Sequence, residues 1–78
     1  MTHKTVLAID DDPKILKVLS QYLEEDGYKV FTAQNGKEAL EIIDKKQVSV
    51  ILLDLVLPDT DGLALMRQIQ SKKDVPII

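Results

Sequence analysis

Residues 6–13 of the chain read VLAIDDDP, which is four apolar residues, three acids and a proline. A short apolar run without polar alternation is typical of a strand that is buried on both faces. Pro13 suits the first position of a helix, and Asp12 stands where its side chain can cap that helix. The stretch therefore predicts a buried parallel strand that leads through an acidic turn directly into a helix.

The same alternation of strand and helix patterns continues along the chain. Strands are expected at 6–9, 28–33 and 48–53, with the beginning of a fourth at 75–78, and helices are expected between them. Strands that alternate with helices form a parallel sheet with right-handed crossovers. Because the first and third runs are the most apolar, we expect them at the centre of the sheet and the second at an edge. The predicted fold class is α/β, a parallel sheet flanked by helices with strand order 2-1-3-4.

Composition limits the classes of protein to which the chain can belong. Its 78 residues are 45% hydrophobic with a formal net charge of −3, which is typical of one small globular domain. There is no Cys and a single His, His3, so a disulfide or a zinc site of Cys and His is excluded. The acidic excess argues against contact with nucleic acid. No apolar run approaches the roughly 18 residues that span a membrane, and no secretory signal opens the chain, so we expect a cytoplasmic protein.

Three acids follow the two strands that are expected at the centre of the sheet. Asp10 and Asp11 come directly after the first strand, and Asp54 follows the third. Neighbouring parallel strands lie about 4.8 Å apart, and ligands of such sheets bind beyond the carboxyl ends of the strands, near the switch in strand order. Three carboxylates that converge there repel one another, so we expect either that one of them takes up a proton or that a cation binds. Oxygen ligands without His or Cys favour a hard cation, most plausibly Mg²⁺.

Ordinary structural roles account for some of the other acids. Asp12 is more easily explained as a helix cap than as a metal ligand. Asp59 and Asp61 lie in a turn sequence, where they are expected to serve the turn and the N-cap of the third helix. Capping does not explain Asp54, because three apolar residues follow it rather than the start of a helix.

Three segments together resemble the receiver domain of two-component response regulators, which has a flavodoxin-like fold. They are VLAIDDDPKILKVLSQYLEEDGYKV, TAQNGKEALEII and VSVILLDLVLPDTDGLALMRQI. The resemblance implies that Asp54 accepts a phosphoryl group from a sensor histidine kinase or a phosphotransfer protein. It also implies that Asp10, Asp11, Asp54 and the main-chain carbonyl of Val56 hold Mg²⁺. Such a domain is a signalling module of a phosphorelay rather than a conventional enzyme.

The resemblance also implies that residues 1–78 form the N-terminal two thirds of a receiver, with the fifth strand missing. The family has a Thr or Ser after the fourth strand and a Lys after the fifth. Lys72 and Lys73 precede the fourth strand, so neither can take the place of that Lys. Three explanations stay open: a fragment of a longer chain, a deliberate truncation, or a piece completed by swapping or pairing with another copy.

The absence of the fifth helix leads to an expectation about exposure. In the family, the first and fifth helices cover one face of the sheet. Without the fifth helix, we expect four apolar strand residues to face water in part, namely Leu7, Ile9, Ile51 and Leu53.

Two other functions require residues that this sequence lacks. A phosphatase with an aspartyl nucleophile requires a second Asp at the position of Val56, and a nucleotide-binding half-domain requires a Gly-rich phosphate loop after the first strand. A non-switching interaction fragment that swaps or oligomerises stays open as the alternative. The resemblance further makes the first helix, including Ile15 and Leu16, a candidate surface for kinase docking, although apolar residues at helical spacing are more often core.

Overall fold

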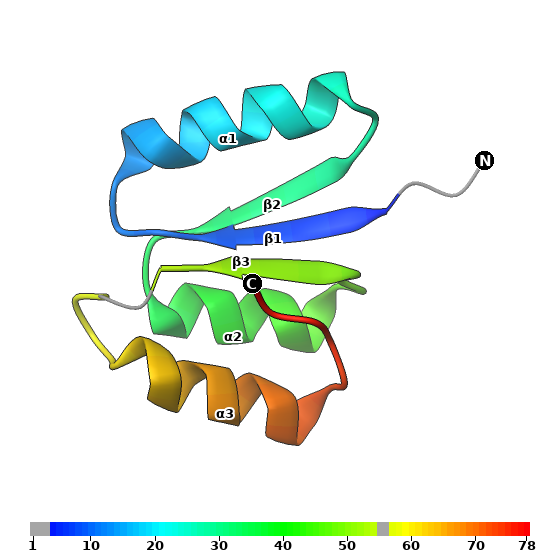
Figure 1. Ribbon diagram of the computed structural model, residues 1–78. Coiled ribbons are helices and arrows are strands. Elements are labelled where there is room, and N and C mark those ends of the chain that lie inside the picture. The colour runs from blue at the N-terminus through cyan, green and yellow to red at the C-terminus, as the bar shows by residue number, and fades with distance from the viewer. Residues whose placement is uncertain (1–3, 55–56) are drawn as a thin grey trace.

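The computed structural model describes residues 4–54 and 57–78. Strands and helices alternate along these residues as the sequence predicts (Figure 1). The elements are β1 (Thr5–Ile9), α1 (Pro13–Glu25), β2 (Lys29–Ala33), α2 (Gly36–Lys45), β3 (Val50–Leu53) and α3 (Gly62–Lys72). Among the described residues, no helix has both the length and the apolar character needed to cross a membrane.

The three strands form one parallel sheet in the order β2-β1-β3, which confirms the predicted arrangement. Ile9, the last residue of β1, lies in register with Ala33 on one side and with Leu53 on the other. The final residues run along the free edge of β3, where Ile77 makes a parallel bridge to Ile51. The amide of Ile78 donates to the carbonyl of Ile51 over 2.8 Å. The segment expected to begin a fourth strand therefore lies beside β3.

Capping groups mark the ends of the helices. Asp12 is the N-cap of α1, where its Oδ1 accepts a hydrogen bond from the amide of Lys14 over 2.9 Å. Pro13 opens this helix, and Gly27 lies just beyond it with a φ of 91°. That left-handed conformation favours glycine. The predicted cap and first residue of α1 are both confirmed.

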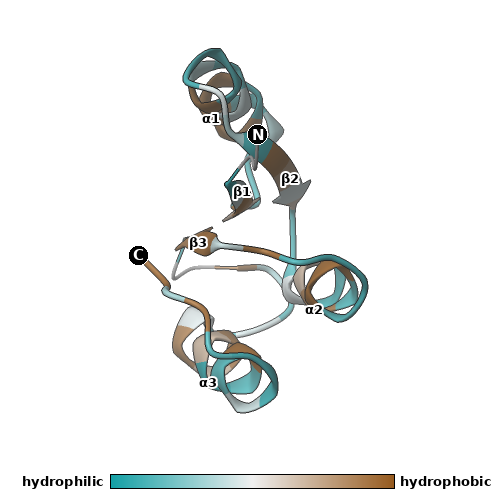
Figure 2. Ribbon diagram, turned by 90° about the vertical axis from the view of Figure 1, so that its right-hand side faces the viewer, coloured by the Kyte–Doolittle hydropathy of each residue, from teal (hydrophilic) through white to brown (hydrophobic). Residues whose placement is uncertain are grey.

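Helices cover the two faces of the sheet unequally. α1 lies alone on one face, over β1 and β2, whereas α2 and α3 pack together on the other (Figures 1 and 2). The main apolar core lies between the sheet and the pair α2 and α3. Its buried members are Leu7, Ile9, Ala33, Ala39, Ile43, Ile51, Leu57, Leu65, Ile69 and Val75.

The expectation about exposed strand residues is wrong for three of its four members. Leu7 and Ile51 have no exposed side-chain surface and Ile9 is 2% exposed, because all three point toward α2 and α3. Side chains alternate between the faces of a strand, so the residue that lacks cover on the α1 face is the partly buried Leu52. Ile15, on α1 beside it, is 45% exposed. The open apolar surface therefore lies on the α1 face, as expected, but Leu52 contributes to it in place of Leu7, Ile9 and Ile51.

Candidate metal centre at the carboxyl edge of the sheet

Two backbone hydrogen bonds place the acids that follow β1 and β3. The amide of Asp10 donates to the carbonyl of Ala33 over 3.0 Å, and the amide of Asp54 donates to the carbonyl of Ile9 over 2.9 Å. These bonds continue the hydrogen-bonding pattern of the sheet one residue beyond the strands. Asp10 and Asp54 therefore leave neighbouring strands at the same edge, which is where ligands of such sheets bind.

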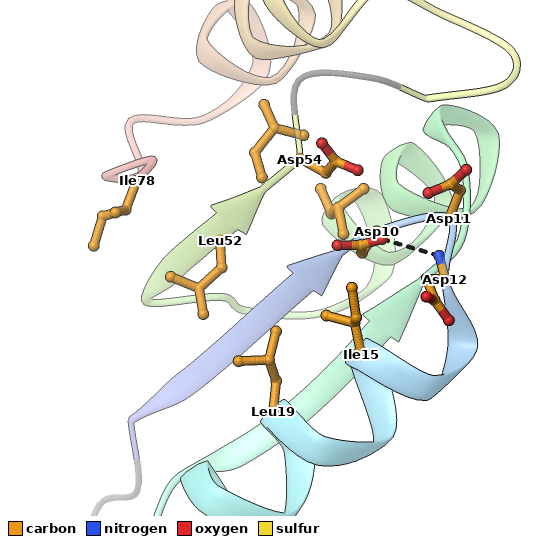
Figure 3. Close-up of a pocket in the computed structure, with 10 residues that line it drawn as sticks. Asp10, Asp11, Asp12, Ile15, Leu19, Leu52, Asp54 and Ile78 are labelled. Atoms are coloured by element: carbon orange, nitrogen blue, oxygen red, sulfur yellow. Dashed lines mark hydrogen bonds between the residues drawn. The ribbon is translucent and has the colours of Figure 1, made fainter.

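The three acids that the sequence singles out come together at this edge. One carboxylate oxygen from each of Asp10, Asp11 and Asp54 lies within 4.8 Å of the other two (Figure 3). Asp10 and Asp54 are half-buried, whereas Asp11 is exposed. The predicted convergence is confirmed, while the chemical role of each residue stays a prediction.

The donor set fits a hard divalent cation. All three candidate ligand atoms are carboxylate oxygens, the type that Mg²⁺ and Ca²⁺ prefer. The amide of Asp12 donates to Oδ1 of Asp10 over 2.9 Å, which fixes the orientation of that carboxylate (Figure 3). Three negative groups this close repel one another unless a cation offsets their charge.

Apolar side chains form one wall of the cleft that holds the acids. The cleft has a volume of about 550 Å³ and is lined on this side by Ile15 and Leu19 of α1, Leu52 of β3 and Ile78 near the end of the chain (Figure 3). Apolar groups lower the local dielectric constant, so that charge interactions on this side of the cleft are stronger than in bulk water. The arrangement suits the binding of a small, highly charged group at a carboxylate-held cation.

The two acids of the turn sequence have different roles. Asp61 is the N-cap of α3, as predicted, and accepts from the amide of Leu63 over 2.9 Å. Asp59 does more than serve its turn: its Oδ1 accepts from the amide of Gly36 over 2.8 Å and its Oδ2 from that of Lys37 over 3.1 Å. The hydrogen bond from Gly36 is the main cause that lowers the pKa of Asp59 below its usual range, and the bond from Lys37 lowers it further.

Sequence reasoning missed this contact of Asp59 with α2. The first amides of a helix have no acceptor within the helix. The side chain of Asn35, the N-cap of α2, accepts from the amide of Glu38 over 2.9 Å. The sequence therefore indicated that the amides of Gly36 and Lys37 need hydrogen-bond acceptors from elsewhere. It did not indicate that Asp59, more than 20 residues away, is that acceptor.

The remaining predicted residues fall at several places. Val56 lies outside the described residues. Lys72 bonds to Asp44 over 3.1 Å at the end of α3, away from the acids, in agreement with the expectation that it cannot serve the site. Leu16 is buried in the core, whereas its neighbour Ile15 is exposed on the wall of the cleft.

Comparisons with known proteins agree on one family. A family model described as the response regulator receiver domain matches residues 6–78. The transcriptional regulatory protein ResD of Bacillus subtilis (strain 168) is 42% identical over 78 residues, which are 99% of this chain and 32% of that protein. The regulatory protein VanR of Enterococcus faecium is 40% identical over 73 residues, 94% of this chain and 32% of that protein. The chain spans about a third of the length of these relatives.

Solved structures share the arrangement of strands and helices. A two-component response regulator from Clostridium difficile superposes with a TM-score of 0.94 at 32% identity, over 96% of this chain and 62% of that one. The response regulator protein TrrA from Thermotoga maritima, in complex with Mg(2+)-BeF, superposes with a TM-score of 0.89 at 37% identity, over 95% of this chain and 65% of that one.

Proposed function

The chain belongs to the response regulator receiver domain family, and from this premise we propose that Asp54 accepts a phosphoryl group in a Mg²⁺-dependent phosphorelay. The donor would be a sensor histidine kinase or a phosphotransfer protein. The observation that carries the proposal is the convergence of oxygens from Asp10, Asp11 and Asp54 to within 4.8 Å of one another. In this proposal the main-chain carbonyl of Val56 is a further metal ligand.

The chemistry of the transfer explains why a cation is needed. A carboxylate oxygen of Asp54 attacks the phosphorus of a phosphohistidine, the P–N bond breaks as the new O–P bond forms, and the imidazole leaves with the bonding electron pair and takes up a proton. Nucleophile and phosphoryl group are both anionic, so they repel each other as they approach. When bound, Mg²⁺ supplies the positive charge that offsets this repulsion and the charge of the transition state.

The chain's own residues position the reacting carboxylate. The amide of Asp54 donates to the carbonyl of Ile9, which holds the proposed phosphoryl acceptor beside the central strand β1. The amide of Asp12 donates to the carboxylate of Asp10 and orients it. Positioning and electrostatic stabilisation together are most of what a protein contributes to phosphoryl transfer, because there is little covalent chemistry for it to do. A relative of the same fold, TrrA, was crystallised with Mg(2+)-BeF, which supports Mg²⁺ as the cation here.

The proposal is tested by intact mass after incubation with a small phosphodonor such as phosphoramidate. The unmodified chain is expected to gain the mass of one phosphoryl group when Mg²⁺ is present and not when a chelator replaces it. Asp54→Asn removes the acceptor and is expected to abolish the gain. Asp74→Asn, which removes one exposed carboxylate outside the site, is the matched control and is expected to react normally.

A second role is favoured by the exposed apolar residues of α1. Ile15 is 45% exposed and Val18 is 50% exposed, which is typical of a surface that another group covers. We propose as the alternative that the chain is a non-switching interaction fragment that swaps or oligomerises, with residues 1–78 equivalent to the N-terminal two thirds of a receiver. If the chain gains no phosphoryl group in the presence of Mg²⁺, this alternative is the one that stands.

A further inference from the structure

Asp59 forms a contact that the receiver chemistry does not require of it. Its two carboxylate oxygens accept from the amides of Gly36 and Lys37, at 2.8 Å and 3.1 Å. These are the first two residues of α2, which lie 23 and 22 residues away in the sequence. One side chain thus joins the loop that follows Asp54 to the start of a different helix.

Close packing accompanies these hydrogen bonds. A Cβ atom added at Gly36 would lie 2.7 Å from Cγ2 of Thr60 and 3.4 Å from Oδ1 of Asp59. The first of these distances is shorter than van der Waals contact allows. Gly36 is buried, so the lack of a side chain there lets the loop lie directly against the first turn of α2. The loop and the helix are therefore joined by packing as well as by charge.

The contact completes a ring of attachments around the acids. The amide of Asp10 bonds to Ala33 at the end of β2, and only two residues separate Ala33 from Gly36 at the start of α2. The amide of Gly36 donates to Asp59, which lies in the loop after Asp54. The amide of Asp54 in turn donates to the carbonyl of Ile9 in β1. Asp59 thereby links the loop of one acid to the strand end that holds another.

We propose that Asp59 is a positioning residue for the reaction at Asp54: by holding the loop after β3 against the start of α2, it fixes the distance between the acids of the metal centre. This inference rests on the proposed function, because it assumes that those acids bind Mg²⁺. Asp59 itself touches neither cation nor substrate. Its negative charge is favoured where it lies, since the N-terminus of a helix carries partial positive charge.

The alternative is that Asp59 only caps α2 and stabilises the fold. Asn35 separates the two roles, because its side chain caps the same helix through the amide of Glu38 without joining the loop of Asp54. Asn35→Ala is therefore the matched control: it removes a cap of α2 and leaves the contact of Asp59 in place. A loss of Mg²⁺ binding that follows Asp59 and not Asn35 reports positioning rather than helix stability.

The experiment measures the Mg²⁺ dissociation constant by isothermal titration, and the rate of phosphoryl transfer from phosphoramidate by intact mass. It compares the unmodified chain with Asp59→Ala, Asp59→Asn and Asn35→Ala, at a temperature where circular dichroism shows each to be folded. Asp59→Ala is expected to raise the dissociation constant about tenfold, as loss of a group that orients metal ligands does. Asp59→Asn keeps one acceptor oxygen and is expected to fall between. Asn35→Ala is expected to stay within about twofold of the unmodified chain.

Two results would overturn the inference while the proposed function stands. One is Mg²⁺ binding and transfer by Asp59→Ala that match the unmodified chain, and the other is an equal loss in Asn35→Ala. If the unmodified chain itself neither binds Mg²⁺ nor gains a phosphoryl group, the proposed function fails and the inference fails with it. If Asp59→Ala does not fold, Asp59→Asn decides, with a rise in the dissociation constant supporting the inference and no rise overturning it.

Discussion

Replacing Asp11 by Asn is expected to change stability in opposite directions with and without Mg²⁺. The oxygens of Asp10, Asp11 and Asp54 lie within 4.8 Å of one another. Two unit charges at that distance repel by about 0.9 kcal/mol in water and by about 3.5 kcal/mol at an effective dielectric constant of 20. Asp11 is exposed, so the lower figure applies to each of its two pairs. Without metal, Asp11→Asn is expected to raise the free energy of unfolding by about 1–2 kcal/mol.

Mg²⁺ reverses the order of the two proteins. A ligand that binds only the folded state stabilises it by about 1.4 kcal/mol at ten times its dissociation constant, and by about 2.7 kcal/mol at one hundred times. The unmodified chain is expected to gain this stability, whereas Asp11→Asn lacks one carboxylate ligand and is expected to gain much less. The unmodified chain is therefore the less stable protein in chelator and the more stable one in excess Mg²⁺.

Thermal melting followed by circular dichroism measures both effects. For a domain of this size, 1 kcal/mol shifts the melting midpoint by roughly 4–8 °C. Low ionic strength is needed, because salt screens exposed charges. Asp74→Asn is the control for the loss of one negative charge and is expected to respond to Mg²⁺ as the unmodified chain does. A lower midpoint for Asp11→Asn in chelator, or an equal Mg²⁺ response in both proteins, would refute the reasoning.

Three further predictions concern packing and pH. Leu65 is fully buried under the sheet, so Leu65→Ala is expected to lower the free energy of unfolding by about 2–5 kcal/mol. Leu63→Ala, at a half-exposed position, is expected to lower it by less than about 0.5 kcal/mol. Urea unfolding measures both. Gly36→Ala forces its Cβ against Thr60 and is expected to cost about 1–3 kcal/mol, most of which Thr60→Ser restores; no recovery in the double variant would contradict the contact. The hydrogen bond from Gly36 lowers the pKa of Asp59. The ionised Asp59 carboxylate therefore contributes fully to stability above about pH 4, and this contribution is lost as the pH falls further. Melting midpoints of Asp59→Asn are expected to decline less than those of the unmodified chain over that acidic range, and equal declines would contradict this.

The strand order could be predicted because the apolar runs of the central strands differ from that of the edge strand. Residues 6–9 are uniformly apolar, whereas residues 29–33 include the exposed Lys29 and Thr32. The same uniformity concealed which face each helix covers. A run such as VLAI has no polar side to distinguish α1 from α2 and α3, so Leu7 and Ile9 were assigned to the wrong face. Only the packed structure resolves that choice.

The acidic site was open to prediction because its geometry follows from the sheet. Asp10 directly follows β1 and Asp54 directly follows β3, and the ends of these adjacent parallel strands meet at one edge. Asp59 was not open to prediction in the same way, because its partners at Gly36 and Lys37 belong to another element. A turn sequence already gave a sufficient local reason for an Asp at that position.

The most direct test of the central proposal identifies the residue that receives the phosphoryl group. The chain is treated with phosphoramidate and Mg²⁺ and then with borohydride, which reduces an aspartyl phosphate to homoserine, and the peptides are sequenced by mass spectrometry. Homoserine is expected at position 54, dependent on Mg²⁺ and absent from Asp54→Asn. Homoserine at position 10 or 11 instead, or none at position 54 when Mg²⁺ is present, would contradict the assignment of Asp54 as the acceptor.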